Sequence, residues 1–324
     1  MARLTLDADY AKIIAPYTSF VPPVATDAAS LRRINDTLIQ GTMSLYPGSN
    51  GDVTETKLSY TSADGNTITL HRFTPSTSSN GNNNPAIIYV HGGGFVSGSV
   101  AGFRKDIVRY ASETGHSIFA PAYRLAPEFA FPKPVEDVYA ALEFLRDNAA
   151  EVKIDPKRIA LMGVSAGGGI AAGVALMARD KNFEPAIRKL VLIYPMLDDR
   201  TRIGEDHPMY KHLTWTMTNN VIGWEAYLAG AGAGVVGGGD KVSPYAAPAR
   251  ASDVSRLPKT YIDVGGLDLF KDEVLAFGGR LLAASVDVEF HLYPGVPHAW
   301  EWIAHSASVT KKAVQNRVWA LQDL

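Results

Sequence analysis

Short apolar runs alternate with helix-like runs from residue 86 to residue 321 of this chain. Six of the apolar runs have the length of buried strands, and amphipathic runs of helical length separate most of them. A strand followed by a helix rejoins its sheet in parallel, so this order predicts a mostly parallel sheet with helices on both faces. The expected strands are 86–90, 117–120, 158–162, 190–194, 260–264 and 288–293, and the expected helices are 104–114, 135–148, 166–180, 271–284 and 307–321.

The remaining segments divide the chain into four parts. Residues 1–50 have no regular pattern apart from helix-like pieces at 8–14 and 28–40, and we expect an N-terminal cap segment there. Two alternating runs, 57–62 and 67–73, predict an antiparallel hairpin that begins the first part of the core, residues 51–197. The interval 198–256 interrupts the β–α order, so it predicts a cap insertion, and residues 257–324 complete the core.

The segment Gly163-Val164-Ser165-Ala166-Gly167 lies between an expected strand and an expected helix. A serine in a G-x-S-x-G motif at such a junction sits on a sharp turn that exposes its hydroxyl above the sheet. The motif arises easily by chance in a chain with 29 glycines, so its position after a strand carries the interpretation. Ser165 is therefore the candidate nucleophile.

A second glycine-rich segment, His91-Gly92-Gly93-Gly94-Phe95, follows the first expected strand of the β–α series. A glycine turn after a strand is the simpler explanation of this segment when it stands alone. With the serine motif downstream, the segment is typical of an oxyanion loop, whose backbone N–H groups face a developing negative charge. We expect His91 to make a structural hydrogen bond in this loop.

A serine hydroxyl is a poor nucleophile until a nearby base can remove its proton. Among the eight histidines, His298 is the candidate base, because it lies in a proline-rich loop directly after the expected strand 288–293. It also follows the serine in the chain order that this architecture requires. The other histidines lie in expected strands, in irregular polar segments or in the glycine-rich loop.

The imidazole of such a base needs an acid that fixes its tautomer. Asp268 is the candidate, because it follows the expected strand 260–264 at the edge where α/β sheets build their sites. Asp263 lies inside that strand. Asp272 and Glu273 fit the first turn of the next helix, and we expect them on its solvated surface.

Six blocks of the sequence, in the same order, resemble motifs of the hormone-sensitive-lipase-like group of α/β-hydrolase carboxylesterases. The likeness covers roughly residues 60 to 320, and it implies an α/β-hydrolase fold with a mobile helical cap. Two positions depart from the family pattern: Val164 stands where the family usually has aspartate, and Leu269 where it often has proline. The six blocks are residues 91–95, 123–128, 155–156, 165–168, 268–273 and the loop 294–300.

The resemblance also implies a function. It predicts a serine carboxylesterase that hydrolyses small esters, with short acyl chains, through an acyl-enzyme intermediate. Two other activities stay open: hydrolysis of an amide, lactone or carbamate at the same site, and ligand binding without cleavage by a receptor of the same fold. The implied catalytic triad is Ser165, Asp268 and His298, and the implied oxyanion hole is formed by the amides of Gly93, Gly94 and Ala166.

Aromatic residues of the interval 198–256 fit either a pocket wall or the packing of lid helices, and the sequence leaves both open. The resemblance favours a pocket wall for Trp215. Phe95, the last residue of the glycine-rich segment, is a second expected pocket residue.

The composition argues against several other classes of protein. A formal net charge of −2 gives no electrostatic support for binding nucleic acid or an anionic membrane. The chain has no cysteine, which excludes disulfides and thiolate chemistry. The segment 232–237 matches a dinucleotide fingerprint, but no strand precedes it, so we interpret it as a loop. No cofactor and no metal are expected.

The first residues lack the continuous apolar core of a signal peptide, and no stretch has the length of a membrane span. We therefore expect a cytoplasmic protein. The sequence leaves the oligomeric state open, and a homodimer is one option.

Overall fold

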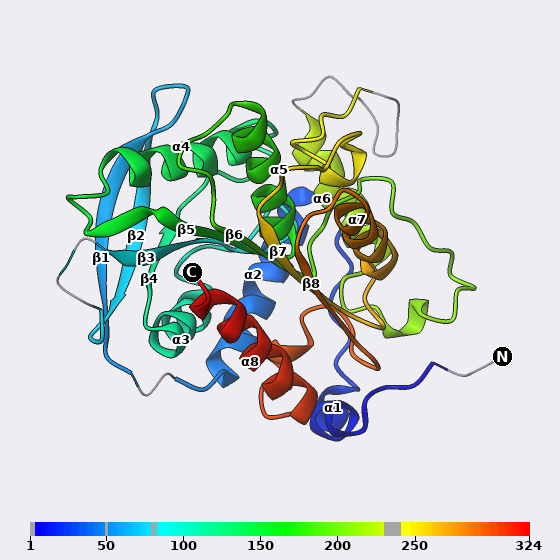
Figure 1. Cartoon of the computed structure of the whole chain (residues 1–324). Helices are drawn as coiled ribbons and strands as arrows, with labels where there is room; N and C mark the ends of the chain where they lie inside the picture. The colour runs from blue at the N-terminus through cyan, green and yellow to red at the C-terminus, as the bar shows by residue number, and fades with distance from the viewer. Residues whose placement is uncertain (1–3, 49–50, 79–80, 82, 230–240) are drawn as a thin grey trace.

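Eight strands form one mostly parallel sheet in the computed structural model, which describes residues 4–48, 51–78, 81, 83–229 and 241–324 (Figure 1). Their order is β1-β2-β4-β3-β5-β6-β7-β8. The hairpin partners β1 and β2 and the pair β2 and β4 are antiparallel, and all other pairs are parallel. The strands are β1 (Val53–Thr61), β2 (Thr67–Pro75), β3 (Asn84–Val90), β4 (Ser117–Pro121), β5 (Ile154–Val164), β6 (Lys189–Ile193), β7 (Lys259–Gly265) and β8 (Val288–Tyr293).

Helices cover both faces of this sheet. Helices α3 and α8 lie together on one face, and α4, α5 and α7 lie on the other (Figure 1). This arrangement confirms the predicted α/β fold with helices on both faces. The helices are α1 (Ala8–Ile14), α2 (Ala28–Leu45), α3 (Arg104–Thr114), α4 (Lys133–Asp147), α5 (Ala166–Asp180), α6 (Met217–Leu228), α7 (Lys271–Ala283) and α8 (Ser308–Gln322), with short 3-10 turns at Ala15–Tyr17, Tyr210–His212, Pro248–Arg250 and Trp300–Trp302.

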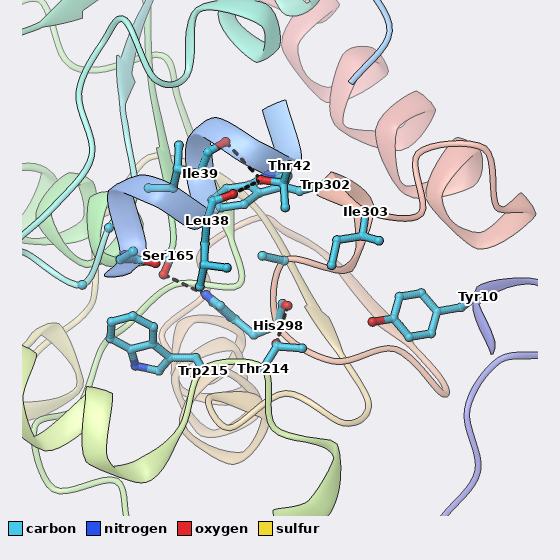
Figure 2. Close-up of a pocket in the computed structure, with 14 residues that line it drawn as sticks. Tyr10, Leu38, Ile39, Thr42, Ser165, Thr214, Trp215, His298, Trp302 and Ile303 are labelled. Carbon is cyan, nitrogen blue, oxygen red and sulfur yellow. Dashed lines mark hydrogen bonds between the residues drawn. The ribbon is translucent and has the colours of Figure 1, made fainter. Parts of the chain in front are cut away.

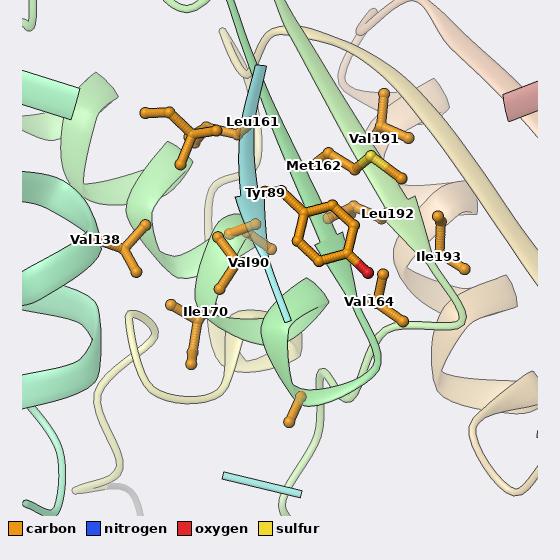
Figure 3. Packing of buried hydrophobic residues seen from close by; sticks show 14 of the residues in the cluster. Tyr89, Val90, Val138, Leu161, Met162, Val164, Ile170, Val191, Leu192 and Ile193 are labelled. Atoms are coloured by element: carbon orange, nitrogen blue, oxygen red, sulfur yellow. The ribbon is translucent and has the colours of Figure 1, made fainter. Parts of the chain in front are cut away.

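The central strands are apolar because both of their faces are covered. Every residue of β3 and β6 is buried, as expected for parallel strands between two helical layers. Figure 3 shows how side chains of β5 and β6, such as Leu161 and Leu192, pack with Val138 of α4 and Ile170 of α5. This rigid centre carries the loops at the carboxyl ends of the strands.

Helix α2 is longer than the predicted piece 28–40. It begins at a capping box, in which Asp27 and Ser30 each bond the other's backbone N–H, and it continues to Leu45. The extension is stabilised by Met43, which is buried, and by Thr42, whose hydroxyl donates to the carbonyl of Leu38 at 2.9 Å. Helix α2 packs against α6 and the turn Trp300–Trp302, so it covers the same edge of the sheet as the interval 198–256.

The expectation that Glu273 lies on a solvated surface is wrong. Its side chain is buried, and its carboxylate accepts hydrogen bonds from the backbone N–H groups of Leu197 and Asp198, at 2.6 and 3.2 Å, and from the Thr201 hydroxyl. The carboxylate therefore ties the segment after β6 to helix α7. Asp272 is exposed, as predicted.

Two other expectations concern a loop and membrane-spanning helices. The segment 232–237, interpreted above as a loop, lies outside the described residues. None of the described helices has the length and apolar character needed to cross a membrane.

Candidate active site

Ser165 occupies the sharp turn between β5 and α5. Its backbone has φ +56° and ψ −121°, a conformation that costs energy for a residue with a side chain and that packing must enforce. Glycines on either side make the turn possible, because a Cβ at Gly167 would lie 2.1 Å from the carbonyl oxygen of Val90 and one at Gly163 would lie 2.3 Å from that of Gly167. Strand β3 and the turn thus hold Ser165 at the carboxyl edge of the sheet.

Three side chains that are far apart in the sequence form one hydrogen-bonded chain at this edge. Figure 2 shows the part of it that joins Ser165 to His298. The Ser165 Oγ lies 2.9 Å from Nε2 of His298, and Nδ1 of His298 lies 2.7 Å from Oδ2 of Asp268. A carboxylate only accepts hydrogen bonds, so Nδ1 carries the proton and Nε2 is the acceptor for the Ser165 hydroxyl. The three residues are at least nine-tenths buried.

The imidazole of His298 is held on several sides. The rings of Tyr194 and Phe270 meet it edge-on, with centroids 4.7 and 5.0 Å away. Oδ1 of Asp268 accepts the backbone N–H of Phe270 at 2.9 Å, which leaves Oδ2 for the imidazole. Thr214, from the interval 198–256, donates its hydroxyl to the carbonyl oxygen of His298 at 2.7 Å.

The glycine-rich loop lies directly beside the serine. A Cβ at Gly92 would lie 3.2 Å from the Cβ of Ser165. Gly93 and Gly94 have φ of +127° and +59°, which glycine adopts without a steric cost. The backbone N–H groups of these two glycines donate no hydrogen bond to any described residue. Both glycines also line the same cavity as Ser165.

His91 makes the structural hydrogen bond that the sequence predicts. Its Nδ1 lies 2.8 Å from the carbonyl oxygen of Gly92, and its ring stacks on Tyr123 with centroids 4.4 Å apart. Burial lowers the pKa of His91 to about 4, so the ring is neutral at pH 7 and Nδ1 is its proton donor. The peptide unit after Gly92 is planar and trans, so fixing this carbonyl also fixes the direction of the Gly93 N–H.

A cavity of about 140 Å³ opens onto Ser165 and His298. It extends from Ser165 and Trp215 at one end to Tyr10 at the other (Figure 2). None of the described residues that line it is an Asp, Glu, Lys or Arg. The lining residues are Tyr10, Asn35, Leu38, Ile39, Thr42, Gly93, Gly94, Ser165, Thr214, Trp215, His298, Ala299, Trp302 and Ile303.

The two expected pocket residues lie in different places. Trp215 lines the cavity, and its indole lies so close to Gly94 that a Cβ there would be 2.2 Å from it. Phe95 is not among the lining residues. Its ring is buried and stacks on Tyr227 with centroids 4.1 Å apart, because α6 packs over the glycine-rich loop.

Sequence reasoning missed most of the cavity wall. Leu38 and Ile39 come from α2, Tyr10 comes from α1, and Trp302 and Ile303 follow the His298 loop. The apolar spacing within the predicted helix 28–40 was the one available signal. It indicates that one face of the helix is buried, but it does not identify the part of the protein that this face contacts.

Comparisons with known proteins identify the family of this fold. A family model described as "alpha/beta hydrolase fold" matches residues 87–302. Esterase LipI of Mycobacterium tuberculosis is 31% identical over 244 residues, which are 74% of this chain and 72% of LipI. Ethyl acetate hydrolase of Pseudomonas putida is 28% identical over 245 residues, 74% of each chain.

The fold also matches solved structures over nearly its full length. One of them, titled "Bacterial Heroin Esterase", superposes with a TM-score of 0.85 and 35% sequence identity, and the match covers 98% of both chains. The matched motifs, the sheet order and these relatives agree, and the chain belongs to the hormone-sensitive-lipase-like group of α/β-hydrolase carboxylesterases.

Proposed function

We propose that this chain hydrolyses small, uncharged carboxylic esters with short acyl chains, and that Ser165 carries the acyl group between two half-reactions. One observation carries the proposal: the hydrogen-bonded chain from Ser165 through His298 to Asp268 stands beside the free N–H groups of Gly93 and Gly94. This combination supplies a nucleophile, its base, and donors for negative charge within one cavity.

In the first half-reaction the Ser165 Oγ attacks the ester carbonyl carbon while its proton moves to Nε2 of His298. A new C–O bond forms, and the carbonyl π electrons move to the oxygen. When the tetrahedral intermediate collapses, the bond to the leaving alcohol breaks and Nε2 returns the proton to the departing oxygen. Asp268 keeps the proton on Nδ1 throughout and stabilises the imidazolium.

We assign the backbone N–H groups of Gly93, Gly94 and Ala166 as the hydrogen-bond donors to the oxyanion of that intermediate. The amide of Ala166 belongs to the first turn of α5, where backbone N–H groups lack helical partners and the helix dipole favours negative charge. Each such donor is worth about 3 kcal/mol in the transition state.

In the second half-reaction a water molecule takes the place of the alcohol. His298 removes its proton, the water oxygen attacks the acyl carbon, and the bond to Ser165 breaks as Oγ regains a proton from Nε2. The products are a carboxylic acid and free enzyme, so every atom of the water is accounted for.

The size and lining of the cavity support small substrates. A volume of about 140 Å³ is similar to that of a cavity that holds one benzene molecule, roughly 150 Å³. The described lining offers no charged partner for an ionic substrate, so burial of such a substrate would be unfavourable. The name of the relative ethyl acetate hydrolase agrees with a short acyl chain.

We further propose that residues 1–50 and 198–256 act together as the cap over this cavity. Tyr10 and Leu38 come from the first segment, and Thr214 and Trp215 come from the second. A cytoplasmic location and a homodimer stay predictions from the sequence.

The test combines a substrate panel with a covalent label. We expect turnover of p-nitrophenyl esters to be highest for acetate to butyrate and to fall for longer acyl chains. A fluorophosphonate should label one peptide, at Ser165, and Ser165→Ala should lose both label and turnover while keeping its thermal unfolding transition. Ser99→Ala, an exposed serine of the following loop, is the matched control.

Each alternative gives a different result. Cleavage of amides, lactones or carbamates in preference to esters would change the proposed substrate class but leave the assignment of the site intact. Failure of the label to reach Ser165, or near-normal turnover by Ser165→Ala, would overturn the serine mechanism and favour a receptor.

A further inference from the structure

Helix α2 makes three polar contacts with the residues that directly follow the glycine-rich loop. Arg32 Nε donates to the carbonyl oxygen of Val96 at 2.5 Å, and Asn35 Nδ2 donates to the Ser97 Oγ at 2.6 Å. In a third contact, Asp36 Oδ1 accepts the backbone N–H of Gly98 at 2.8 Å. Residues 32, 35 and 36 lie on one face of a helix, so α2 docks on this loop as a unit.

The contact of Asn35 continues into the loop itself. The Ser97 Oγ donates to the carbonyl oxygen of Gly93 at 2.7 Å. The same carbonyl accepts the backbone N–H groups of Ser97 and Val96, at 3.0 and 3.2 Å. Because Ser97 has one hydroxyl proton, the Asn35 amide occupies its acceptor side and directs that proton to Gly93.

The carbonyl of Gly93 shares its peptide unit with the N–H of Gly94. In a planar trans peptide these two groups point in opposite directions, so a carbonyl that is held on one side directs the N–H toward the other. The Gly94 N–H is one of the donors proposed above for the oxyanion. His91 holds the preceding peptide in the same way, through the carbonyl of Gly92.

We infer that Asn35 and Ser97 are positioning residues for the oxyanion hole, which they orient through the Gly93 carbonyl. The reactivity of the serine then depends on α2 being docked, since Asn35 belongs to that helix. This inference rests on the proposed function. It concerns the rate of the chemical step, because neither hydrogen bond is made to the substrate.

The test is a double-mutant cycle. Ser97→Ala removes the donor to Gly93, and Asn35→Leu removes the donor to Ser97 while keeping a side chain of similar size. We expect Ser97→Ala to lower kcat by about 10- to 50-fold, less than the 100- to 1,000-fold loss for deleting an oxyanion donor. We expect Asn35→Leu to lower kcat by a smaller factor, and the double variant to be no slower than Ser97→Ala alone.

A second readout separates positioning from a loss of structure. A trifluoromethyl ketone forms a tetrahedral adduct with the serine, and the oxygen of this adduct binds in the oxyanion hole. The matching ketone without fluorine forms little adduct and stays planar. The Ki of the trifluoromethyl ketone should rise in both single variants by about the factor lost in kcat/KM. The Ki of the planar ketone and the thermal unfolding transition should change little.

Ser99→Ala is the matched control, because it removes a hydroxyl two residues further along that bonds the N–H of Gly102 and not the glycine-rich loop. It should keep the wild-type kcat. Unchanged kcat in Ser97→Ala, or an Asn35→Leu effect that persists in full in the Ser97→Ala background, would overturn the inference. A wild-type protein that hydrolyses no ester would instead refute the proposed function.

Discussion

The phenol ring of Tyr194 meets the imidazole of His298 edge-on, with ring centroids 4.7 Å apart and an angle of 69° between the planes. Its hydroxyl donates to Oε1 of Glu301 at 2.6 Å. One side chain therefore joins the base of the candidate active site to the polar interior behind it. Burial raises the pKa of Tyr194 well above its usual value, so the phenol stays neutral and acts as a donor.

The interior behind Tyr194 is organised by a fully buried guanidinium. Arg317 donates to Asp263 at 2.6 and 3.1 Å and to Glu301 at 2.6 Å, and its guanidinium lies 5.4 Å from the centre of the Tyr194 ring. Tyr261 completes the group by donating to Asp263 at 2.9 Å. The two buried carboxylates thus have a buried charged partner.

We expect Tyr194→Phe to reduce stability more than activity. The variant loses a hydrogen bond to a buried carboxylate, which costs about 2 kcal/mol of unfolding free energy, but it keeps the ring edge against His298. Urea unfolding and kcat/KM measure the two effects. Tyr261→Phe, which removes the other phenol of the group, should cost similar stability. A loss of kcat/KM specific to Tyr194→Phe would show that its hydroxyl acts on the imidazole.

Asp268→Asn should lower kcat by on the order of 10³- to 10⁴-fold. An amide nitrogen facing Nδ1 favours the tautomer with the proton on Nε2, which cannot accept the Ser165 proton. Steady-state kinetics with p-nitrophenyl acetate measures the loss. Asp272→Asn, on an exposed acid of the next turn, is the control and should stay within about 2-fold. Equal rates for both variants would exclude Asp268 from the mechanism.

The fold was predictable because its signals are local. Helix α5 and strand β8 have the bounds expected from the sequence, 166–180 and 288–293, and the hairpin and β–α order were also found. Helix α2 and strand β5 run longer than predicted, because tertiary packing stabilises ends that have weak local patterns. The expected family and ester-hydrolase class are confirmed by the comparisons.

The convergence of Ser165, Asp268 and His298 could also be predicted, although their catalytic roles stay predictions. Each residue follows the carboxyl end of a strand, and β5, β7 and β8 are close neighbours in one parallel series. Residues after parallel strands meet at one edge of the sheet, so chain order and turn chemistry were sufficient.

The cavity wall and the support of the loop could not be predicted in this way. Asn35 reaches Ser97 across 62 positions, and Glu273 reaches the backbone of Leu197 across 76. The sequence shows that α2 and α7 have buried faces, but it does not show which distant backbone groups they meet. Such contacts depend on how whole helices dock, which local patterns do not encode.

Stability should fall in acid because of His91. Its pKa is about 4 in the folded protein and about 6.5 in the unfolded chain, so the unfolded chain binds the proton more readily. The free energy of unfolding is therefore unaffected by His91 above about pH 6.5 and decreases as the pH falls toward 4. The decrease is about 2 kcal/mol between pH 7 and pH 5.

Urea unfolding at pH 7 and pH 5 of the wild type and of His91→Gln isolates this contribution, since other titrating groups affect both proteins. The wild type should lose about 2 kcal/mol more than the variant between the two pH values. Between pH 7 and pH 8 the two proteins should behave alike, which is the internal control. Equal losses from pH 7 to pH 5 would mean that the buried ring does not resist protonation.

The far end of the cavity should select for a polar oxygen through Tyr10. The side chain is buried, burial raises its pKa to about 12, and its hydroxyl makes no hydrogen bond to a described residue while lining the cavity. In matched esters that differ by one terminal hydroxyl, the hydroxylated ester should gain about 5- to 10-fold in kcat/KM, and Tyr10→Phe should abolish that gain. Tyr17→Phe, at an exposed position nearby in the chain, should retain it. If Tyr10→Phe keeps the higher kcat/KM for the hydroxylated ester, the hydroxyl is recognised by another residue.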